Sequence, residues 1–237
     1  LFVRSLLAAR SIDTGFDTGP AAIIWPEFEL SGVDDAEGPV LWREIERRLR
    51  ANPLVDEVAF AEPLPLGAGV HTTAVEIPGV PSERRPDGAW SIDQSTVSPS
   101  YFPTMEIPIV RGRNFDAADR DTTSTAVVVS RAFQERFFPD GAVGRTIRAR
   151  GERTIVGVAE DTKVRTLGEA PRPRIYFPHG YRYQSSIQIV VRGSASPDRL
   201  ISETRAVLDE VRPGIVLFEA KTMEEHLRFS VAYWHTF

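Results

Sequence analysis

The sequence predicts an α+β fold in which a split βαβ layer carries a long β-rich insertion. Three observations support this class. A strand–helix–strand pattern near the start of the chain recurs near its end, and the segment between the two copies consists of short strands and turns. The chain has 237 residues, of which 42% are apolar, enough for a sizeable core.

The first strand–helix–strand unit lies close to the N-terminus. Residues 21–30 form an apolar run that is typical of a strand, and residues 55–61 form another that is rich in Val, Ala and Phe. Between them, residues 39–52 have the spacing of an amphipathic helix. Its apolar face carries Leu41, Ile45 and Leu49, while arginine and glutamate occupy the other faces.

The second unit repeats this order near the C-terminus. Residues 187–192 predict a strand, Ser196 and Pro197 predict the start of a helix, and residues 215–219 predict the closing strand. Two units of matched length predict one ferredoxin-like α/β layer, made of residues 18–61 and 186–220.

The insertion, residues 62–185, differs in character because proline and glycine interrupt it often. Gly151 and Glu152 predict a hairpin turn, and residues 130–137 predict the single clear helix. The strands that we expect in it are residues 73–77, 95–98, 107–111, 126–130, 146–150, 153–159 and 174–177.

Both ends of the chain predict apolar helices. Residues 1–17 are interpreted as the stub of a preceding membrane helix followed by a turn, and residues 221–237 as a helix that leads to the next membrane helix. Thr222 and Glu225 have the spacing of a capping box at the start of the second helix. No stretch reaches the roughly 18 consecutive apolar residues of a membrane span.

Composition excludes several classes of function. The net charge of −5 argues against a nucleic-acid-binding protein, which usually carries a basic surface. The absence of cysteine excludes disulfides, thiolate zinc sites and a cysteine nucleophile.

The four histidines, His71, His179, His226 and His235, do not have the spacing of a metal site. Only His226 has close carboxylates, Glu224 and Glu225, and neighbours one and two positions apart diverge around a helix. We therefore expect no metal ligands, and His226 is interpreted as a residue on the helix surface near its start.

Three further strings resemble catalytic or binding motifs without matching them. The nearest string to a serine-hydrolase elbow, residues 193–197, is explained by a loop that ends in a helix cap. Residues 141–146 are too short for a phosphate loop and lead into a strand. Residues 114–121 lack the glycine and the closing glutamate of a calcium loop and are interpreted as a solvated turn. The sequence thus predicts no catalytic, cofactor-binding or metal-binding residue, and a protein that is not an enzyme.

The middle of the chain contains a series of short motifs, which begins with VSPSYFPTMEIP at residues 97–108 and RGRNF at residues 111–115. The series continues through residues 126–133, 137–139, 143–147, 155–161 and 173–178, and ends at residues 222–225. In content and order it resembles the periplasmic core domains of MacB/FtsX-type ABC transporter permeases. One departure is Ser130, where members of the family tend to carry asparagine.

The resemblance implies a non-catalytic domain outside the cytoplasmic membrane, with a porter-type α/β layer and an inserted part. ATP would be hydrolysed by a separate cytoplasmic ATPase, and the outer domain would move with it to export a substrate or activate a partner. Its partners would be its own transmembrane helices, that ATPase, a second copy in a homodimer, and a periplasmic adaptor or outer-membrane channel. The resemblance supplies no catalytic residues or cofactor.

Two alternatives remain open at this point. A periplasmic module that binds a small molecule or peptide would need a concave pocket with a few polar groups. An enzyme with a dispersed active site would need residues that only the fold brings together.

Overall fold

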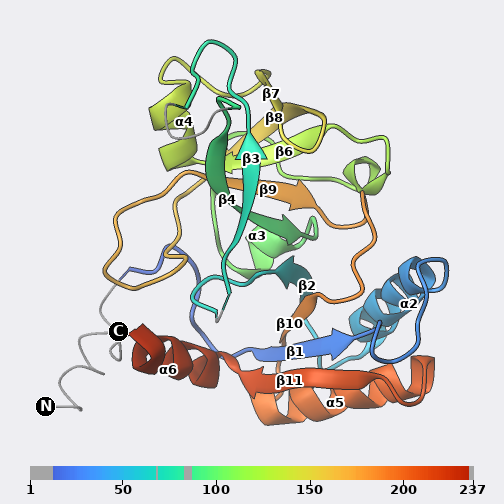
Figure 1. Cartoon of the computed structure of the whole chain (residues 1–237). Coiled ribbons are helices and arrows are strands. Elements are labelled where there is room, and N and C mark those ends of the chain that lie inside the picture. The colour runs from blue at the N-terminus through green and yellow to red at the C-terminus, as the bar shows by residue number, and fades with distance from the viewer. Residues whose placement is uncertain (1–12, 68, 83–86, 235–237) are drawn as a thin grey trace, which may run out of the picture.

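The computed structural model describes residues 13–67, 69–82 and 87–234, with side chains to residue 228. Its strands form one mixed sheet of eleven strands (Figure 1). The order along the sheet is β11-β1-β10-β2-β4-β9-β6-β8-β5, with β3 paired to β4 and β7 paired to β8. The predicted α+β class is confirmed. The predicted helix at the N-terminus lies mainly outside the described residues.

The two predicted βαβ units form one antiparallel layer. The first consists of β1 (Ala22–Glu27), α2 (Gly38–Ala51) and β2 (Glu57–Glu62), and the second of β10 (Gln188–Arg192), α5 (Pro197–Val211) and β11 (Val216–Thr222). Strand β1 lies between β10 and β11, and β10 also pairs with β2, so the two units interleave. This is the order of a ferredoxin-like layer, in which Ile24 lies opposite Ile189.

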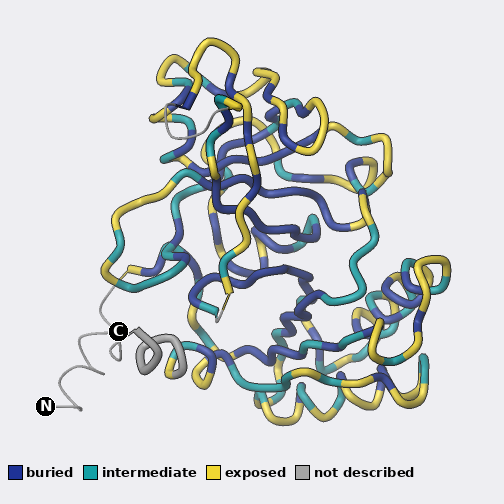
Figure 2. Tube along the Cα trace, viewed as in Figure 1, coloured by how far each residue is buried: buried dark blue, intermediate teal, exposed yellow. Residues whose placement is uncertain are grey.

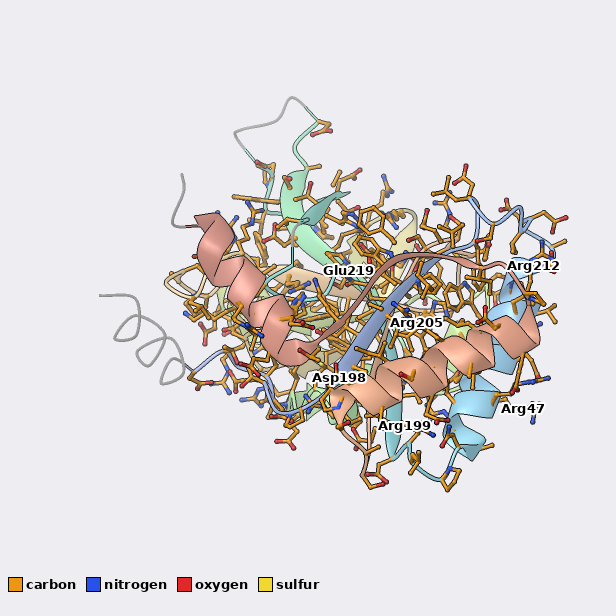
Figure 3. All side chains as sticks on the ribbon, turned by 90° about the horizontal axis from the view of Figure 1, so that it is seen from below. Arg47, Asp198, Arg199, Arg205, Arg212 and Glu219 are labelled. Atoms are coloured by element: carbon orange, nitrogen blue, oxygen red, sulfur yellow. The ribbon has the colours of Figure 1, made fainter. Side chains whose placement is uncertain are left out.

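Helices α2 and α5 cover one face of this layer because each has one apolar side. Trp42, Ile45 and Leu49 of α2 are buried there against strand residues such as Ile24 and Phe60. Charged side chains remain on the outer side of the helices, where Figure 3 labels Arg47, Arg199 and Arg205 among others.

Both predicted helix caps are present. The Ser196 hydroxyl accepts a hydrogen bond from the Arg199 backbone N–H at 3.4 Å, with Pro197 at the first helical position of α5. The Thr222 hydroxyl accepts from the Glu225 N–H at 3.1 Å, and the Glu225 carboxylate accepts from the Thr222 N–H at 2.8 Å. This reciprocal pair begins α6 (Met223–Trp234).

The insertion contributes the rest of the sheet and two short α-helices. Parallel pairs join β4 to β9 and β6 to β8, and the other pairs in this part are antiparallel. Strands β7 and β8 form the expected hairpin, with Gly151 at a φ of +102°. The elements of the insertion, in chain order, are β3 (His71–Val75), β4 (Trp90–Val97), α3 (Tyr101–Thr104), β5 (Ile109–Gly112), a 3-10 turn (Ala118–Arg120), β6 (Ala126–Ser130), α4 (Arg131–Phe137), β7 (Thr146–Arg148), β8 (Glu152–Ala159) and β9 (Arg174–Pro178).

Strand β4 starts at Trp90, five residues before the expected strand at residue 95. Its added part contains polar residues, and Asp93 among them is only 4% exposed. The Asp93 carboxylate lies 2.6 Å from Arg165 Nη2 and 3.2 Å from Arg172 Nε, two residues far along the chain. A buried carboxylate of this kind is compatible with a strand only because distant arginines neutralise it.

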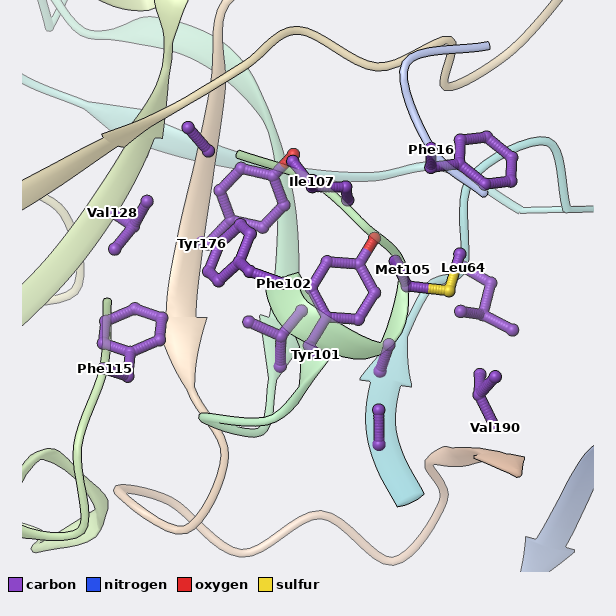
Figure 4. Packing of buried hydrophobic residues seen from close by; sticks show 14 of the residues in the cluster. Phe16, Leu64, Tyr101, Phe102, Met105, Ile107, Phe115, Val128, Tyr176 and Val190 are labelled. Atoms are coloured by element: carbon purple, nitrogen blue, oxygen red, sulfur yellow. The ribbon is translucent and has the colours of Figure 1, made fainter. Parts of the chain in front are cut away.

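The layer and the insertion share one sheet and one of three clusters of buried hydrophobic residues, while the other two clusters belong to the layer and to the insertion separately. Strands β2 and β4 pair at Ala61 and Val97, which carries the sheet from the layer into the insertion. A single buried cluster contains Val190 of β10 together with Tyr101, Phe102 and Tyr176 of the insertion (Figure 4). Buried residues follow the strands through both parts, and the exposed stretches lie mainly in turns and on outer helix faces (Figure 2). The division into residues 18–61 plus 186–220 and residues 62–185 stays a prediction.

Candidate functional site

The three histidines that the structure describes belong to different segments of the chain. His71 begins β3 and is half-exposed, and His179 follows β9 and is buried. His226 is buried in α6, where a position on the helix surface was expected. Among residues 13–67, 69–82 and 87–234, no group of three or more His, Cys, Asp or Glu side chains could hold a metal ion. His235 lies outside the described residues.

The three strings that resemble motifs all serve local structure. Gly193 lies in the connection from β10 to α5, and Gly144 lies in the turn before β7. In the aspartate-rich turn, Asp119 is buried and accepts hydrogen bonds from Arg113 Nη1 at 2.5 Å and from the Asp116 backbone N–H at 2.9 Å. We therefore find a turn held by internal hydrogen bonds where a solvated turn was expected.

The structure does bring distant segments together where the chain enters and leaves the layer. We call this region the junction: residues 14–22 before and at the start of β1, residues 222–226 at the start of α6, and the parts of the insertion that contact them. The Met223 backbone N–H donates to the Ala21 carbonyl at 2.9 Å, and Ala22 lies opposite Thr222 in the sheet. The incoming and outgoing segments are therefore side by side (Figure 1).

The incoming segment is attached directly to the insertion. The Asp17 N–H donates to the Met105 carbonyl at 2.8 Å, and the Lys163 N–H donates to the Thr14 carbonyl at 2.8 Å. Gly15 has a φ of +74°, and a Cβ there would lie 2.1 Å from the Asp161 carbonyl oxygen. Only glycine fits this close approach of two backbone segments.

Arg192, at the end of β10, forms hydrogen bonds to both the incoming segment and α3. Its Nη1 lies 2.8 Å from the Asp17 carboxylate, and its Nη2 donates to the Asp17 carbonyl at 2.9 Å. Its Nε donates to the carbonyl of Thr104 in α3 at 2.9 Å. The guanidinium, on a side chain only 13% exposed, thus joins the layer, the incoming segment and the insertion.

His226 attaches the outgoing helix to the insertion. Its Nε2 lies 2.8 Å from the Pro65 carbonyl oxygen, and because a carbonyl only accepts, Nε2 carries the proton. Burial lowers the pKa of His226 and so favours the neutral ring. Both ends of the layer therefore contact the insertion through hydrogen bonds of their own.

Sequence reasoning did not identify Asp17, Arg192 or His226 as a connected group. Each contact joins residues at least 80 positions apart, and single residues of these types carry no local pattern. The sequence of the incoming segment indicated only a turn, and a glycine at position 15 fits an ordinary turn.

Comparison with known proteins identifies the class. Residues 10–207 match the family model of the MacB-like periplasmic core domain. No curated protein matches the chain in sequence. The chain belongs to the family of MacB-like periplasmic core domains, which are parts of ABC transporter permeases.

Two solved structures share the fold. The periplasmic region of MacB from Actinobacillus actinomycetemcomitans superposes with a TM-score of 0.59 at 11% identity, covering 92% of this chain and 94% of that one. The extracellular domain of the noncanonic ABC-type transporter YknZ from Gram-positive bacteria superposes with a TM-score of 0.54 at 14% identity, covering 84% of this chain and 100% of that one. None of the helices that the structure describes is long and apolar enough to cross a membrane.

Proposed function

We propose that this domain transmits movement from membrane helices to the space outside the membrane, without chemistry of its own. Cytoplasmic ATP hydrolysis supplies the energy, and the inserted part is displaced to expel a substrate or to activate a partner. The single observation that supports this role is the junction, in which both ends of the layer are hydrogen-bonded to each other and to the insertion. Movement of two linked helices then reaches the insertion directly.

This route differs from transmission through the α/β layer alone. The Asp17 N–H donates to the Met105 carbonyl, and His226 contacts Pro65, so each end has a contact with the insertion that bypasses the strands. Arg192, at the end of β10, adds contacts to Asp17 and Thr104. A shift of packed elements as rigid bodies is a common form of such transitions. The proposed partners are the permease's own transmembrane helices, a cytoplasmic ATPase, a second protomer, and an adaptor or outer-membrane channel.

The test uses the full-length permease in lipid nanodiscs. A nitroxide is attached at Asp140→Cys, in a turn of the insertion, and the distance between the labels of two protomers is measured with ADP and with trapped ATP. The domain has no cysteine of its own to compete for the label. We expect the distance to change with the nucleotide, and we expect Arg192→Ala to shrink that change at least twofold while ATPase activity persists.

Arg199→Ala is the matched control, because Arg199 forms only an exposed ion pair with Glu203 on α5 (Figure 3). It should leave both the distance change and the ATPase activity as in the unmodified permease. A nucleotide-independent distance, or a full distance change in Arg192→Ala, would contradict the proposed role of the junction.

A further inference from the structure

A second feature of the domain is a semi-enclosed pocket of about 600 Å³ beside the junction. It lies where β1, the end of β2, the start of β3 and the segment before β10 meet. The residues on its wall that matter here are Trp25, Glu62, His71, Tyr183, Gln184 and Gln188. A cavity of this size admits a small organic molecule.

Hydrogen-bond acceptors without donors are concentrated around this pocket. Glu62 is only 8% exposed, and its Oε2 has no hydrogen-bond partner within the part of the chain that the structure describes. The same holds for Oε1 of Gln184 on the pocket wall and for Oε1 of Glu27. His71 Nε2 lies 3.9 Å from Glu62 Oε1, too far for a hydrogen bond.

Gln184 Oε1 can only accept hydrogen bonds, and so can the Glu27 and Glu62 oxygens when their carboxyls are ionised; buried polar atoms in native proteins are normally paired. An occupant that pairs these oxygens must therefore bring N–H or O–H donors. The Tyr183 hydroxyl on the same wall also has no hydrogen-bond partner among the described residues, and it can donate or accept. Oε1 of Gln188 is paired, because it accepts from the Leu64 backbone N–H at 3.0 Å.

The charges around Glu62 favour a cation among the possible donors. The titratable groups that act on the pocket residues are listed here by the part of the chain that carries them: Glu27 of β1, Glu29, Asp34 and Asp35 of the segment before α2, His71 of β3, Arg150 of the hairpin turn, and Arg182 and Tyr183 of the segment before β10. Arg150 and Arg182 carry permanent positive charges, and the carboxyl groups outnumber them. Burial, followed by the charge of Arg150, lowers the pKa of His71 and so disfavours its cationic form.

Aromatic rings complete the wall. The Trp25 indole N–H donates to the Ser186 hydroxyl at 2.5 Å, and the Trp25 ring lies edge-on to Phe218 with centroids 4.7 Å apart. These contacts hold the indole in place on the pocket wall, beside Tyr183. A fixed indole face attracts a cation, most strongly where water is excluded.

We propose that this pocket binds a small organic molecule through a primary ammonium group, which donates to the Glu62 carboxyl and lies against Trp25. The ammonium has three donors for the unpaired oxygens, and its charge matches the acidic wall. This inference does not depend on movement through the junction, since it concerns binding to the domain alone.

Because Glu62 can bind a proton, the proposal predicts how the affinity depends on pH. Burial, followed by the charge of Glu27, raises the pKa of Glu62 to about 8, so this carboxyl is mostly protonated at neutral pH. A cation favours the ionised form, and binding at lower pH must first remove the proton. Affinity should therefore rise by up to about tenfold per pH unit below pH 8 and level off above it, while the ammonium, with a pKa of about 10, stays charged.

The experiment is calorimetric titration of the 237-residue domain with 1,5-diaminopentane at pH 6, 7 and 8. We expect binding that tightens with pH, and no binding of 1,5-pentanediol, which has the same length but no charge. Glu62→Gln should weaken binding at pH 8 at least tenfold and remove the pH dependence. Trp25→Leu should weaken it severalfold without changing that dependence.

Glu210→Gln is the matched control, because Glu210 pairs with Arg48 on the helical face of the layer. It should bind as the unmodified domain does. Lack of binding by 1,5-diaminopentane at millimolar concentration, equal binding of the diol, or unchanged binding by a folded Glu62→Gln would overturn the proposal. If Glu62→Gln does not fold, the Trp25→Leu result and the pH profile of the unmodified domain decide in its place.

Discussion

At the scale of single residues, the clearest consequence of burial concerns His179. Its ring is stacked on Phe60 with centroids 5.3 Å apart and lies edge-on to Trp42. Burial, followed by the charge of Arg120, lowers the pKa of His179 to about 3. The folded domain therefore keeps this ring neutral over a pH range in which the unfolded chain protonates it.

The sign of the pH effect follows from this difference. The contribution of His179 to the free energy of unfolding is fully present above pH 6.5, which is about the pKa of histidine in the unfolded chain. It is lost as the pH falls from there toward 3, because only the unfolded state takes up the proton. From His179 alone we expect a loss of about 2 kcal/mol in unfolding free energy between pH 8 and pH 5.

Urea denaturation of His179→Phe at the two pH values should show a smaller loss than that of the unmodified domain. Phenylalanine preserves the stacking on Phe60 and removes the titration. His71→Phe, at a half-exposed position, is the comparison and should keep most of the original loss. An identical pH dependence in His179→Phe and the unmodified domain would contradict the assignment.

Single-residue features of this kind were the hardest to predict from sequence. His179 and Glu62 are followed or preceded by proline or glycine, so each looks like a loop residue. Arg174 looks like an ordinary charged strand end, yet it is 1% exposed and donates to the Ser95 hydroxyl. The contacts that bury His179 and Arg174 come from Phe60, Trp42 and Ser95, which are distant in the sequence, and no local pattern records such contacts.

At the scale of elements, Ser130 joins a strand to a helix. Its hydroxyl accepts from the Phe133 N–H at 3.2 Å, which caps α4, and from the Arg174 N–H at 3.1 Å, which links β6 to β9. One hydroxyl therefore accepts hydrogen bonds both from the first turn of α4 and from the first residue of the neighbouring strand β9.

We expect Ser130→Ala to lower the free energy of unfolding by about 1–3 kcal/mol, because it removes a helix cap and leaves a buried N–H without its acceptor. Chemical denaturation at pH 7 measures the change. Ser202→Ala, on the exposed side of α5, is the control and should change stability by less than about 0.5 kcal/mol. Equal effects of the two substitutions would show that the buried hydroxyl has no special role.

Elements with a strong local signal were predicted well. The amphipathic pattern of α2, the Ser196 cap of α5 and the capping box of α6 each depend on residues within one or two helical turns, and the structure contains all three. Helix α3 was not expected, because a run with proline at its third position resembles a turn. The early start of β4 was missed because its polar residues are neutralised from a distance.

At the scale of the whole molecule, the pairing of β2 with β4 matters most. The two βαβ units predicted a layer and an insertion, and their mutual pairing follows from topology rules. Nothing in the sequence indicated that the sheet continues through Ala61 and Val97 or that Val190 packs in the same cluster as Tyr176. Such contacts depend on the register between segments that are far apart in the chain.

A shared sheet and a shared core predict a single cooperative unfolding transition. The domain offers a direct test, because Trp42 lies in the layer and Trp90 lies in the insertion. Variants in which either Trp42 or Trp90 is the sole tryptophan, with the other three of the four replaced by phenylalanine, report on each part by fluorescence during urea denaturation. We expect the two transitions to have the same midpoint and the same slope, since opening either part exposes the common cluster around Phe102.

Circular dichroism of each variant provides the control, because it follows all elements at once and should coincide with both fluorescence curves. Two separated midpoints would mean that the layer and the insertion unfold independently. The contacts of Arg192 and His226 would then be too weak to hold the parts as one body. Coincident transitions would mean that displacement of the helices at the junction cannot leave the insertion behind, which is the mechanical property that the function proposed above requires.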